Sequence, residues 1–309
     1  MNLRFQFAQT VHELAHIDKN IVVVVGDISH GIFKPFAKDY PSRYYNIGIC
    51  EPAMVSLGAG LSKVGLNPVL HTIAPFLIER SFEQLKLDFE YQNQNVNLVS
   101  VGGTFDYSQL GCSHHCYSDV TMLRQLPSSQ IFLPGSAEEF DFLFKKNYRL
   151  PGIKYYRLTE NPHGIPVALD KLTKSGVSIR NGNDLTMVTT GAQLKACSKA
   201  CDFLQDAGIA VDLIYLPQVW PFDPSLLRLS CQKTSSLFVV SELHENGGLF
   251  DQCLKNCADL KLDFFHGMEI SDFVREYGSY TDLCKKVGLV PEVIYEEVLK
   301  RKSILSSVK

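Results

Sequence analysis

The residue best placed for chemistry is Glu51, which lies between a strand-like and a helix-like segment. We expect the strand over Tyr44–Ile49, apolar enough to lie inside a sheet, and the helix over Ala53–Val64. Pro52 suits the start of a helix, because its missing N–H costs nothing there. In an open α/β sheet, ligands bind at the edge where strands lead into helices. Glu51 is therefore a candidate acid–base residue, and the alternative is a solvated glutamate that caps the helix.

The helix after Glu51 carries small residues, which include Gly58 and Gly60. Each glycine inside a helix costs roughly 1 kcal/mol relative to alanine. The cost is understandable where another backbone packs close to the helix. We therefore expect close packing against this helix, which should end at Gly65.

Two further clusters carry polar or metal-binding residue types. The first is the run Cys112–Cys116, which contains His114 and His115. A zinc site needs four converging donors, and five contiguous residues do not easily supply them. We therefore predict no metal site, and expect the histidines either to face a substrate pocket or to be structural. The second cluster, Glu242–Glu245, precedes a Gly-Gly pair and is either a loop at a domain contact, which we favour, or a ligand-facing edge.

The elements that must position these residues alternate between strands and helices. This alternation predicts an α/β fold with two doubly wound domains, a mainly parallel one and a smaller C-terminal one. We expect a domain over residues 1–165, a linker over 166–184 rich in Gly, Pro, Lys and Asn, and a second domain over 185–309. The expected strands are 21–25, 44–49, 68–73, 95–101, 130–133, 153–157, 185–189, 211–216 and 237–240. The expected helices are 3–17, 31–39, 53–64, 74–92, 137–145, 193–207, 249–257, 279–289 and 291–300, and a capping box of Ser136 and Glu139 is expected to begin the fifth.

Composition limits the classes of function. The 309 residues carry a net charge of −3 and are 45% hydrophobic, without the basic stripe that nucleic-acid binding requires. No apolar run reaches the ~18 residues of a membrane span, and the N-terminal segment lacks the apolar block of a signal peptide. Nine scattered cysteines fit a reducing compartment. We therefore expect a cytoplasmic protein.

Common nucleotide and nucleophile motifs are absent from the sequence. Gly58-Ala59-Gly60 lies within the expected helix, not at a strand–helix turn, so it does not form a dinucleotide-binding fingerprint. There is also no Walker A loop and no serine nucleophile elbow.

The order of several blocks resembles a known family. It is similar to the C-terminal half of transketolase and of 1-deoxyxylulose-5-phosphate synthase, which are thiamine-diphosphate enzymes. The likeness covers nearly all of the chain. The blocks that carry it are 46–65 (NIGICEPAMVSLGAGLSKVG), 75–85 (PFLIERSFEQL), 111–126 (GCSHHCYSDVTMLRQL) with 130–138, and 156–164 with 241–248.

The resemblance implies a role for Glu51. In the family, a glutamate at this position protonates a ring nitrogen of the cofactor's aminopyrimidine and favours the imino tautomer. That tautomer removes the thiazolium proton, and the resulting carbanion attacks a ketose carbonyl. Phe76 and Phe82 are expected to line the pyrimidine pocket, with Leu77 as the alternative to Phe76, and Asp27 is expected to contribute to the cofactor site.

The same resemblance implies substrate-binding residues. His114 matches the family's substrate-hydroxyl histidine, and His115 matches a second histidine of the synthases. Arg157 lies near the transketolase arginine that binds a substrate phosphate, and Arg80 near one in the synthases. Arginine suits that role because its planar fork pairs with phosphate through two hydrogen bonds.

Departures from the family make a standard phosphorylated ketose doubtful. Residues 110–113 (LGCS) replace the usual Asp-Gly-Pro-Thr, so the aspartate that binds a sugar hydroxyl is missing. A second transketolase histidine, expected near Gly102, is missing as well. Asp106 or Tyr107 is the expected substitute for the aspartate.

The magnesium motif of the family's N-terminal domain is not found in the chain, and Gly26-Asp27-Ile28 does not match it. The resemblance therefore implies a split transketolase. An N-terminal transketolase subunit would bind the cofactor's diphosphate and Mg²⁺, and the assembly would be an α2β2 heterotetramer. Glu51 and His114 are its expected catalytic residues in this chain, and no metal is expected to bind here.

Two alternatives remain open at this point. The chain also resembles the beta subunit of a 2-oxo acid dehydrogenase decarboxylase in length and layout. Its adjacent histidines and its segment 122–133 look more like the transketolase side. The other alternative is a non-catalytic assembly subunit, against which the acid at position 51 counts.

Overall fold

The computed structural model describes residues 2–308, with side chains through Lys302. The chain forms two compact units. The first contains Met1–Tyr107 and Ser113–Pro162, and the second contains Ser108–Cys112 and His163–Lys309. Each unit has its own mainly parallel sheet, so the predicted α/β class with two doubly wound domains is confirmed.

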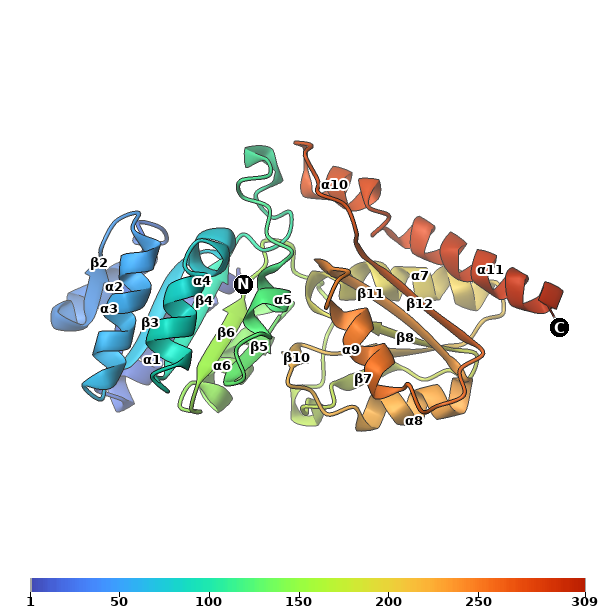
Figure 1. Cartoon of the computed structure of the whole chain (residues 1–309), viewed down its shortest axis with the longest axis horizontal. Coiled ribbons are helices and arrows are strands. Elements are labelled where there is room, and N and C mark those ends of the chain that lie inside the picture. The colour runs from blue at the N-terminus through green and yellow to red at the C-terminus, as the bar shows by residue number, and fades with distance from the viewer. Residues whose placement is uncertain (1, 309) are drawn as a thin grey trace. The chain divides into compact units, whose positions relative to one another are not determined.

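The first unit alternates strands and helices from its first residues (Figure 1). Its helices and turns are α1 (Leu3–Ile17), α2 (Lys34–Asp39), η1 (Pro41–Arg43), α3 (Glu51–Lys63), η2 (Pro75–Glu79), α4 (Phe82–Gln84), η3 (Leu85–Glu90), α5 (Asp119–Leu123) and α6 (Ala137–Asn147). Its strands are β1 (Ile21–Val25), β2 (Tyr44–Asn46), β3 (Asn67–Ile73), β4 (Val96–Val101), β5 (Ser129–Phe132) and β6 (Ile153–Arg157).

These strands are parallel and follow the order β5-β6-β4-β3-β1-β2. Crossovers between parallel strands are right-handed. With this strand order they place α3, α4 and α5 on one face of the sheet and α2 and α6 on the other. Helix α1 packs on α6. Because all the strands point the same way, their carboxyl ends meet at one edge. That edge collects the residues that follow β1, β2, β3, β4 and β6.

Local sequence explains most of these elements. The β-branched run of β1 is buried along its whole length, as a strand covered on both faces should be. Ser136 caps α6 by accepting from the Glu139 N–H at 3.2 Å, and the Glu139 carboxylate accepts from the N–H of Gly135 at 2.9 Å. The capping prediction is thus right for Ser136, whereas Glu139 bonds to the residue before the cap.

Two predictions in this unit are wrong. The strand before Glu51 was expected inside the sheet, but β2 pairs with β1 alone and its residues are half-buried or exposed. The single helix expected over 74–92 is instead divided into η2, α4 and η3. Both η2 and η3 are wider π turns, in which Arg80 N–H donates to Pro75 O and Tyr91 N–H to Lys86 O. Insertions of this kind are frequent at functional sites.

The second unit contains a sheet of order β12-β11-β8-β9-β7, parallel except for β7 at the edge. Its strands are β7 (Val177–Arg180), β8 (Leu185–Thr189), β9 (Val211–Tyr215), β11 (Ser236–His244) and β12 (Phe264–Ile270), and a short strand, β10 (Gln218–Trp220), follows β9 in the chain. Its helices and turns are η4 (Ser108–Leu110), η5 (Leu169–Lys171), η6 (Gly191–Gln193), α7 (Leu194–Asp206), α8 (Ser225–Thr234), α9 (Leu249–Asn256), α10 (Tyr280–Lys286) and α11 (Pro291–Val308).

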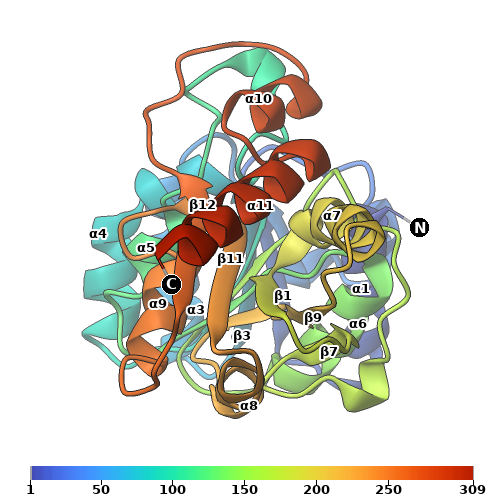
Figure 2. The ribbon, with the colours of Figure 1, turned by 90° about the vertical axis from the view of Figure 1, so that its right-hand side faces the viewer.

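Several elements of this unit were not predicted. They are β7, which falls within the expected linker 166–184, and β10, β12 and α8. Most residues of the edge strand β12 are only partly buried, so its apolar pattern is weak. By contrast, α11 packs on α7 through the Phe203 and Tyr295 rings, 5.9 Å apart, and Figure 2 shows the two helices side by side.

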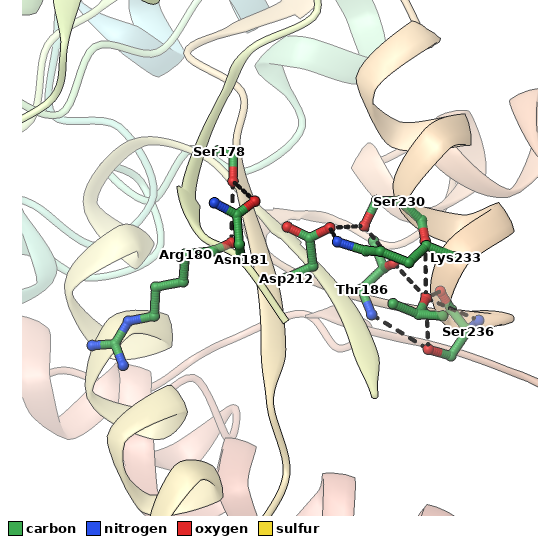
Figure 3. A network of polar contacts seen from close by, with 9 residues as sticks. Ser178, Arg180, Asn181, Thr186, Asp212, Ser230, Lys233 and Ser236 are labelled. Carbon is green, nitrogen blue, oxygen red and sulfur yellow. Dashed lines mark hydrogen bonds and ion pairs between the residues drawn. The ribbon is translucent and has the colours of Figure 1, made fainter. Parts of the chain in front are cut away.

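A polar network connects α8 to the second sheet (Figure 3). Asp212 on β9 accepts from the Ser230 hydroxyl at 2.7 Å and pairs with Lys233 at 2.5 Å. Thr186 on β8 shares hydrogen bonds with the hydroxyls of Ser230 and Thr234. Because each polar group is satisfied within the sheet–helix interface, this network is structural.

In the part of the chain that the structure describes, no helix is both long and apolar enough to cross a membrane.

Candidate active site

Glu51 is the first residue of α3, and its side chain is only 2% exposed. Its Oε2 atom accepts from Nη1 of Arg80 at 2.7 Å, and its Oε1 atom accepts from the Thr72 hydroxyl at 3.4 Å. Thr72 comes from β3, so the carboxylate lies between two neighbouring elements of the sheet edge. The alternative of a solvated capping glutamate is therefore wrong.

The π turn η2 brings Arg80 and Phe76 onto the same side. The Arg80 guanidinium lies over the Phe76 ring, 3.9 Å from its centroid, a cation–π contact. Phe76 is half-buried, whereas Leu77 is fully buried. The ring beside Glu51 and Arg80 is thus that of Phe76, and Leu77 belongs to the core.

His114 reaches the same place from a distant loop. Its ring meets the Phe76 ring edge-on at 5.1 Å, and its Nδ1 atom hydrogen-bonds the Ser113 hydroxyl at 3.0 Å. Burial and the nearby Arg80 charge together lower the pKa of His114. Glu51, Arg80, Phe76 and His114 therefore form one continuous cluster within the first unit.

The loop that carries His114 is held at its base. Thr104 and Cys116 exchange two backbone hydrogen bonds, one in each direction. Just beyond it, the Ser118 hydroxyl donates to the Glu79 carboxylate at 2.5 Å, and Glu79 is the last residue of η2. This contact links the histidine loop to the turn that carries Phe76.

The other two predicted cofactor residues lie at the same edge but outside this cluster. Asp27, the second residue after β1, adopts a positive φ of 55° and is exposed. Its carboxylate accepts from the Asn46 side-chain amide at 3.0 Å. Phe82 is half-buried at the start of α4.

Arg157 is enclosed, unlike Arg80. Its Nη1 atom pairs with Asp119 at 3.1 Å, and the two side chains are 7% and 0% exposed. Asp119 also accepts from the Tyr155 hydroxyl at 2.6 Å. A Cβ atom at Gly103 would lie 2.4 Å from Cδ of Arg157, so the backbone of that glycine covers the side chain.

The remaining predicted substrate residues have other surroundings. His115 is buried beside the Phe105 ring, at 5.3 Å. Asp106 accepts from Asn161 at 2.8 Å and from Thr159 at 3.3 Å, so it holds a loop together. Tyr107 lies nearer the cluster, with its ring 6.4 Å from that of His114, and burial raises its pKa to about 12.

Sequence reasoning missed Thr72, Asp119 and Glu79 as parts of this region. Thr72 has a detectable signal, because it is the penultimate residue of a predicted strand that ends at the ligand-binding edge. Asp119 and Glu79 have none, since each depends on a partner about 40 residues away in the sequence.

Comparison with known proteins identifies the family. Residues 1–161 match the transketolase pyrimidine binding domain, and residues 175–294 match the transketolase C-terminal domain. The chain belongs to the transketolase family. The predicted resemblance is therefore confirmed.

Among curated transketolase-family relatives, one subunit of the apulose-4-phosphate transketolase of Phocaeicola vulgatus is 30% identical over 80% of this chain and 80% of its own. A 33.6 kDa protein of the fasciation locus of Rhodococcoides fascians is 32% identical over 76% of this chain and 73% of its own. A 6-deoxy-6-sulfo-D-fructose transketolase subunit from a Clostridium species is 26% identical over 97% of this chain and 95% of its own.

Solved structures show the same relationship. A split-gene transketolase, described as an inactive beta4 tetramer, superposes with a TM-score of 0.86 and 26% identity, covering 97% of this chain and 98% of the other. Transketolase of Pichia stipitis has the same fold at 16% identity, with a TM-score of 0.81. There the match covers 99% of this chain but 46% of the other, so this chain corresponds to about half of an undivided transketolase.

The cofactor of this family is thiamine diphosphate, and the residues at the site fit its aminopyrimidine. A buried carboxylate can hydrogen-bond a ring nitrogen, and the half-buried Phe76 ring offers an apolar surface beside it. Glu51 and Phe76 are thus the residues of this chain that would hold the ring.

Proposed function

We propose that this chain is one subunit of a thiamine-diphosphate-dependent, transketolase-like transferase that moves a two-carbon ketol unit between sugar substrates. The observation that carries the proposal is the buried Glu51 carboxylate at the carboxyl edge of a transketolase pyrimidine-type sheet. Unlike an enclosed structural ion pair, this buried acid has a partner, Arg80, that is 43% exposed, which favours a ligand-binding role over a purely structural one.

Glu51 is proposed to exchange a proton with a ring nitrogen of the aminopyrimidine. When bound, the cofactor supplies the electron sink for cleavage of the ketose carbon–carbon bond. Burial keeps water away from the Glu51 carboxylate, so a bound ring and not solvent would exchange a proton with it. Phe76, Phe82 and Asp27 are proposed to complete this chain's side of the cofactor site.

The substrate is proposed to lie on the His114 side of the cluster. His114 would hydrogen-bond a sugar hydroxyl, and its lowered pKa keeps the imidazole neutral, so that one nitrogen donates and the other accepts. Arg80 would bind an anionic group, and the relatives named for apulose-4-phosphate and 6-deoxy-6-sulfo-D-fructose act on sugars that carry one. His115 and Arg157 are proposed as secondary contacts, with Arg157 reached only if its pair with Asp119 opens.

A partner chain is proposed to bind the diphosphate and Mg²⁺, in an α2β2 heterotetramer in the cytoplasm. The outer face of α3 supports a partner here. A Cβ atom at Gly58 would lie 2.8 Å from Leu70, whereas one at Gly60 would meet nothing within 4 Å in the described part of the chain. Leu57 on the same helix is 41% exposed, Val64 at its C-cap is 75% exposed, and Ile49 just before it is 74% exposed. For the domains we keep 1–165 as the proposed first domain. The second domain, proposed as 185–309, has to begin earlier, because β7 pairs with β9 in its sheet.

The test is reconstitution with the N-terminal transketolase subunit. The complex should transfer ketol units from ketoses to aldoses in the presence of thiamine diphosphate and Mg²⁺. Turnover of 2-oxo acids in place of ketoses would instead show a decarboxylase subunit. A complex that never binds the cofactor would show an assembly subunit.

The isolated chain offers a second test. Because the diphosphate is assigned to the partner, calorimetry should detect little binding of thiamine diphosphate to this chain alone. Tight binding by the single chain would contradict the division of the site between two polypeptides.

A further inference from the structure

Arg80 and Glu51 form an unequal ion pair. The Glu51 side chain is 2% exposed, whereas that of Arg80 is 43% exposed. One guanidinium nitrogen contacts the buried carboxylate at 2.7 Å, and the guanidinium plane covers Phe76, whose ring contacts His114. The same cation therefore lies between the proposed cofactor acid and the proposed substrate pocket.

Arg80 also occupies one of the two carboxylate oxygens that a ring nitrogen could use. Oε2 of Glu51 accepts from Arg80, and Oε1 accepts from Thr72. Moving Arg80 away by itself would leave a buried charge without a partner, which is strongly unfavourable. The exchange becomes favourable when two events coincide. The ring nitrogen replaces Arg80 at Oε2 and shares with it a proton taken up from solvent, and another anion binds the released guanidinium.

We propose that Arg80 is a shared cation that moves between Glu51 and a phosphate group on the sugar substrate, so that cofactor ring and substrate bind with positive cooperativity. The inference rests on the proposed function, because it takes Glu51 as the ring-binding acid. Such coupling is reciprocal, so each ligand raises the affinity of the other by the same factor. Arg80 is then a positioning residue for Glu51 and a specificity residue for phosphorylated sugars.

The first experiment uses the full chain alone and glycerol 3-phosphate as the probe, with isothermal titration calorimetry as the readout for every variant. In Glu51→Gln the guanidinium loses its charged partner, so the probe should bind at least about five-fold more tightly than in the wild type, the lower end of typical coupling. Arg80→Met should abolish this binding, and glycerol should bind to none of the variants. Equal affinity of the wild type and Glu51→Gln would overturn the proposal.

Arg149→Met is the matched control. Arg149 also pairs with a buried carboxylate, Asp18, at 3.1 Å, and its own side chain is 64% exposed. Asp18 precedes β1, at the opposite edge of the sheet. This variant should bind glycerol 3-phosphate like the wild type, and a loss equal to that of Arg80→Met would show binding to surface charge alone, which contradicts the proposal.

The second experiment uses the complex reconstituted with the diphosphate-binding chain. Glycerol 3-phosphate should raise the calorimetric affinity for thiamine diphosphate about five-fold in the wild type and not at all in Arg80→Met. An increase that persists in Arg80→Met, or none in the wild type, would overturn the inference and leave the proposed function standing. A complex without cofactor binding would instead refute the proposed function, and the titration of the single chain would still decide the role of Arg80.

Discussion

Two arginine–carboxylate pairs at the same sheet edge have the same chemistry and different surroundings. In the pair of Arg157 and Asp119 both side chains are almost inaccessible, and Tyr155 donates a further hydrogen bond to the aspartate. In the pair of Arg80 and Glu51 the carboxylate is equally buried, but the arginine is 43% exposed. The enclosed pair is suited to holding β6 and α5 together, and the open pair is suited to exchanging partners.

Position in the fold explains the difference. Arg157 is the last residue of β6, which lies between β4 and β5, and Gly103 covers its side chain. Arg80 follows a π turn, where its guanidinium lies over the Phe76 ring and the side chain stays partly exposed. A resemblance in sequence makes both arginines candidates for binding a substrate phosphate, and the structure favours Arg80.

The largest effect should come from neutralising one carboxylate of each pair. Glu51→Gln should lower the turnover of the reconstituted complex by about 10²–10⁴-fold, because the proton-exchanging group is lost. Its melting temperature should stay close to that of the wild type, since Arg80 is 43% exposed and water can solvate its charge, whereas Arg157 is only 7% exposed. Undiminished turnover would contradict the role of Glu51, and Asp119→Asn should show the reverse pattern, with a lowered melting temperature.

The next effect concerns the arginine of the enclosed pair. Arg157→Met should lower the free energy of unfolding by roughly 3–5 kcal/mol, because Asp119 would remain buried without its cation. Denaturant titration measures this loss. The control is Arg149→Met, whose exposed arginine should contribute much less to the free energy of unfolding. A similar loss of unfolding free energy in the two variants would show that enclosure does not make the Arg157–Asp119 pair more stabilising than an exposed pair.

A smaller effect should follow from crowding the enclosed pair. Gly103→Ala places a methyl group against the Arg157 side chain, which Asp119 holds in place, and should cost about 1–3 kcal/mol. Gly60→Ala is the matched control, because the new methyl group meets no neighbour, and it should stabilise the isolated chain by up to about 1 kcal/mol. Unfolding of both variants by urea compares them directly, and a neutral Gly103→Ala would mean that Arg157 can move aside.

The smallest effect is electrostatic. Burial and the positive charge of Arg80 both disfavour protonated His114 and so lower its pKa. Arg80→Met removes the charge, so the pKa of His114 should rise and the imidazolium should persist to higher pH. Arg157→Met should leave the pKa of His114 unchanged. An NMR titration of the His114 ring protons tests both, and an equal rise in the two variants would show that the two arginines act alike.

Prediction from sequence worked where the local pattern was strong. The bounds of α1, β1, β6 and β8 are those expected, because α1 has a helical apolar pattern and the strands are short runs rich in β-branched or aromatic residues. It failed where the neighbours decide the conformation. Residues 74–92 have a helical pattern but contain two π turns, and Tyr44–Asn46 has a core-like composition but forms an edge strand.

The sequence predicted which residues belong to the candidate site better than it predicted how they are arranged. Glu51, Phe76, Arg80 and His114 were all named from sequence and lie together in the structure. Asp106, the suggested substitute for a missing aspartate, is instead committed to the loop at 159–161. Its partners are more than 50 residues away, so no local pattern could reveal them.

The amino-acid sequence alone determined the α/β class, the family and the place of Glu51 between a strand and a helix, because these depend on periodicity and on residues close together in the chain. Only the tertiary structure decided which arginine is open and which is enclosed. That difference arises from burial, which depends on the order of the strands and on partners from distant elements, and the sequence around Arg80 or Arg157 does not contain it.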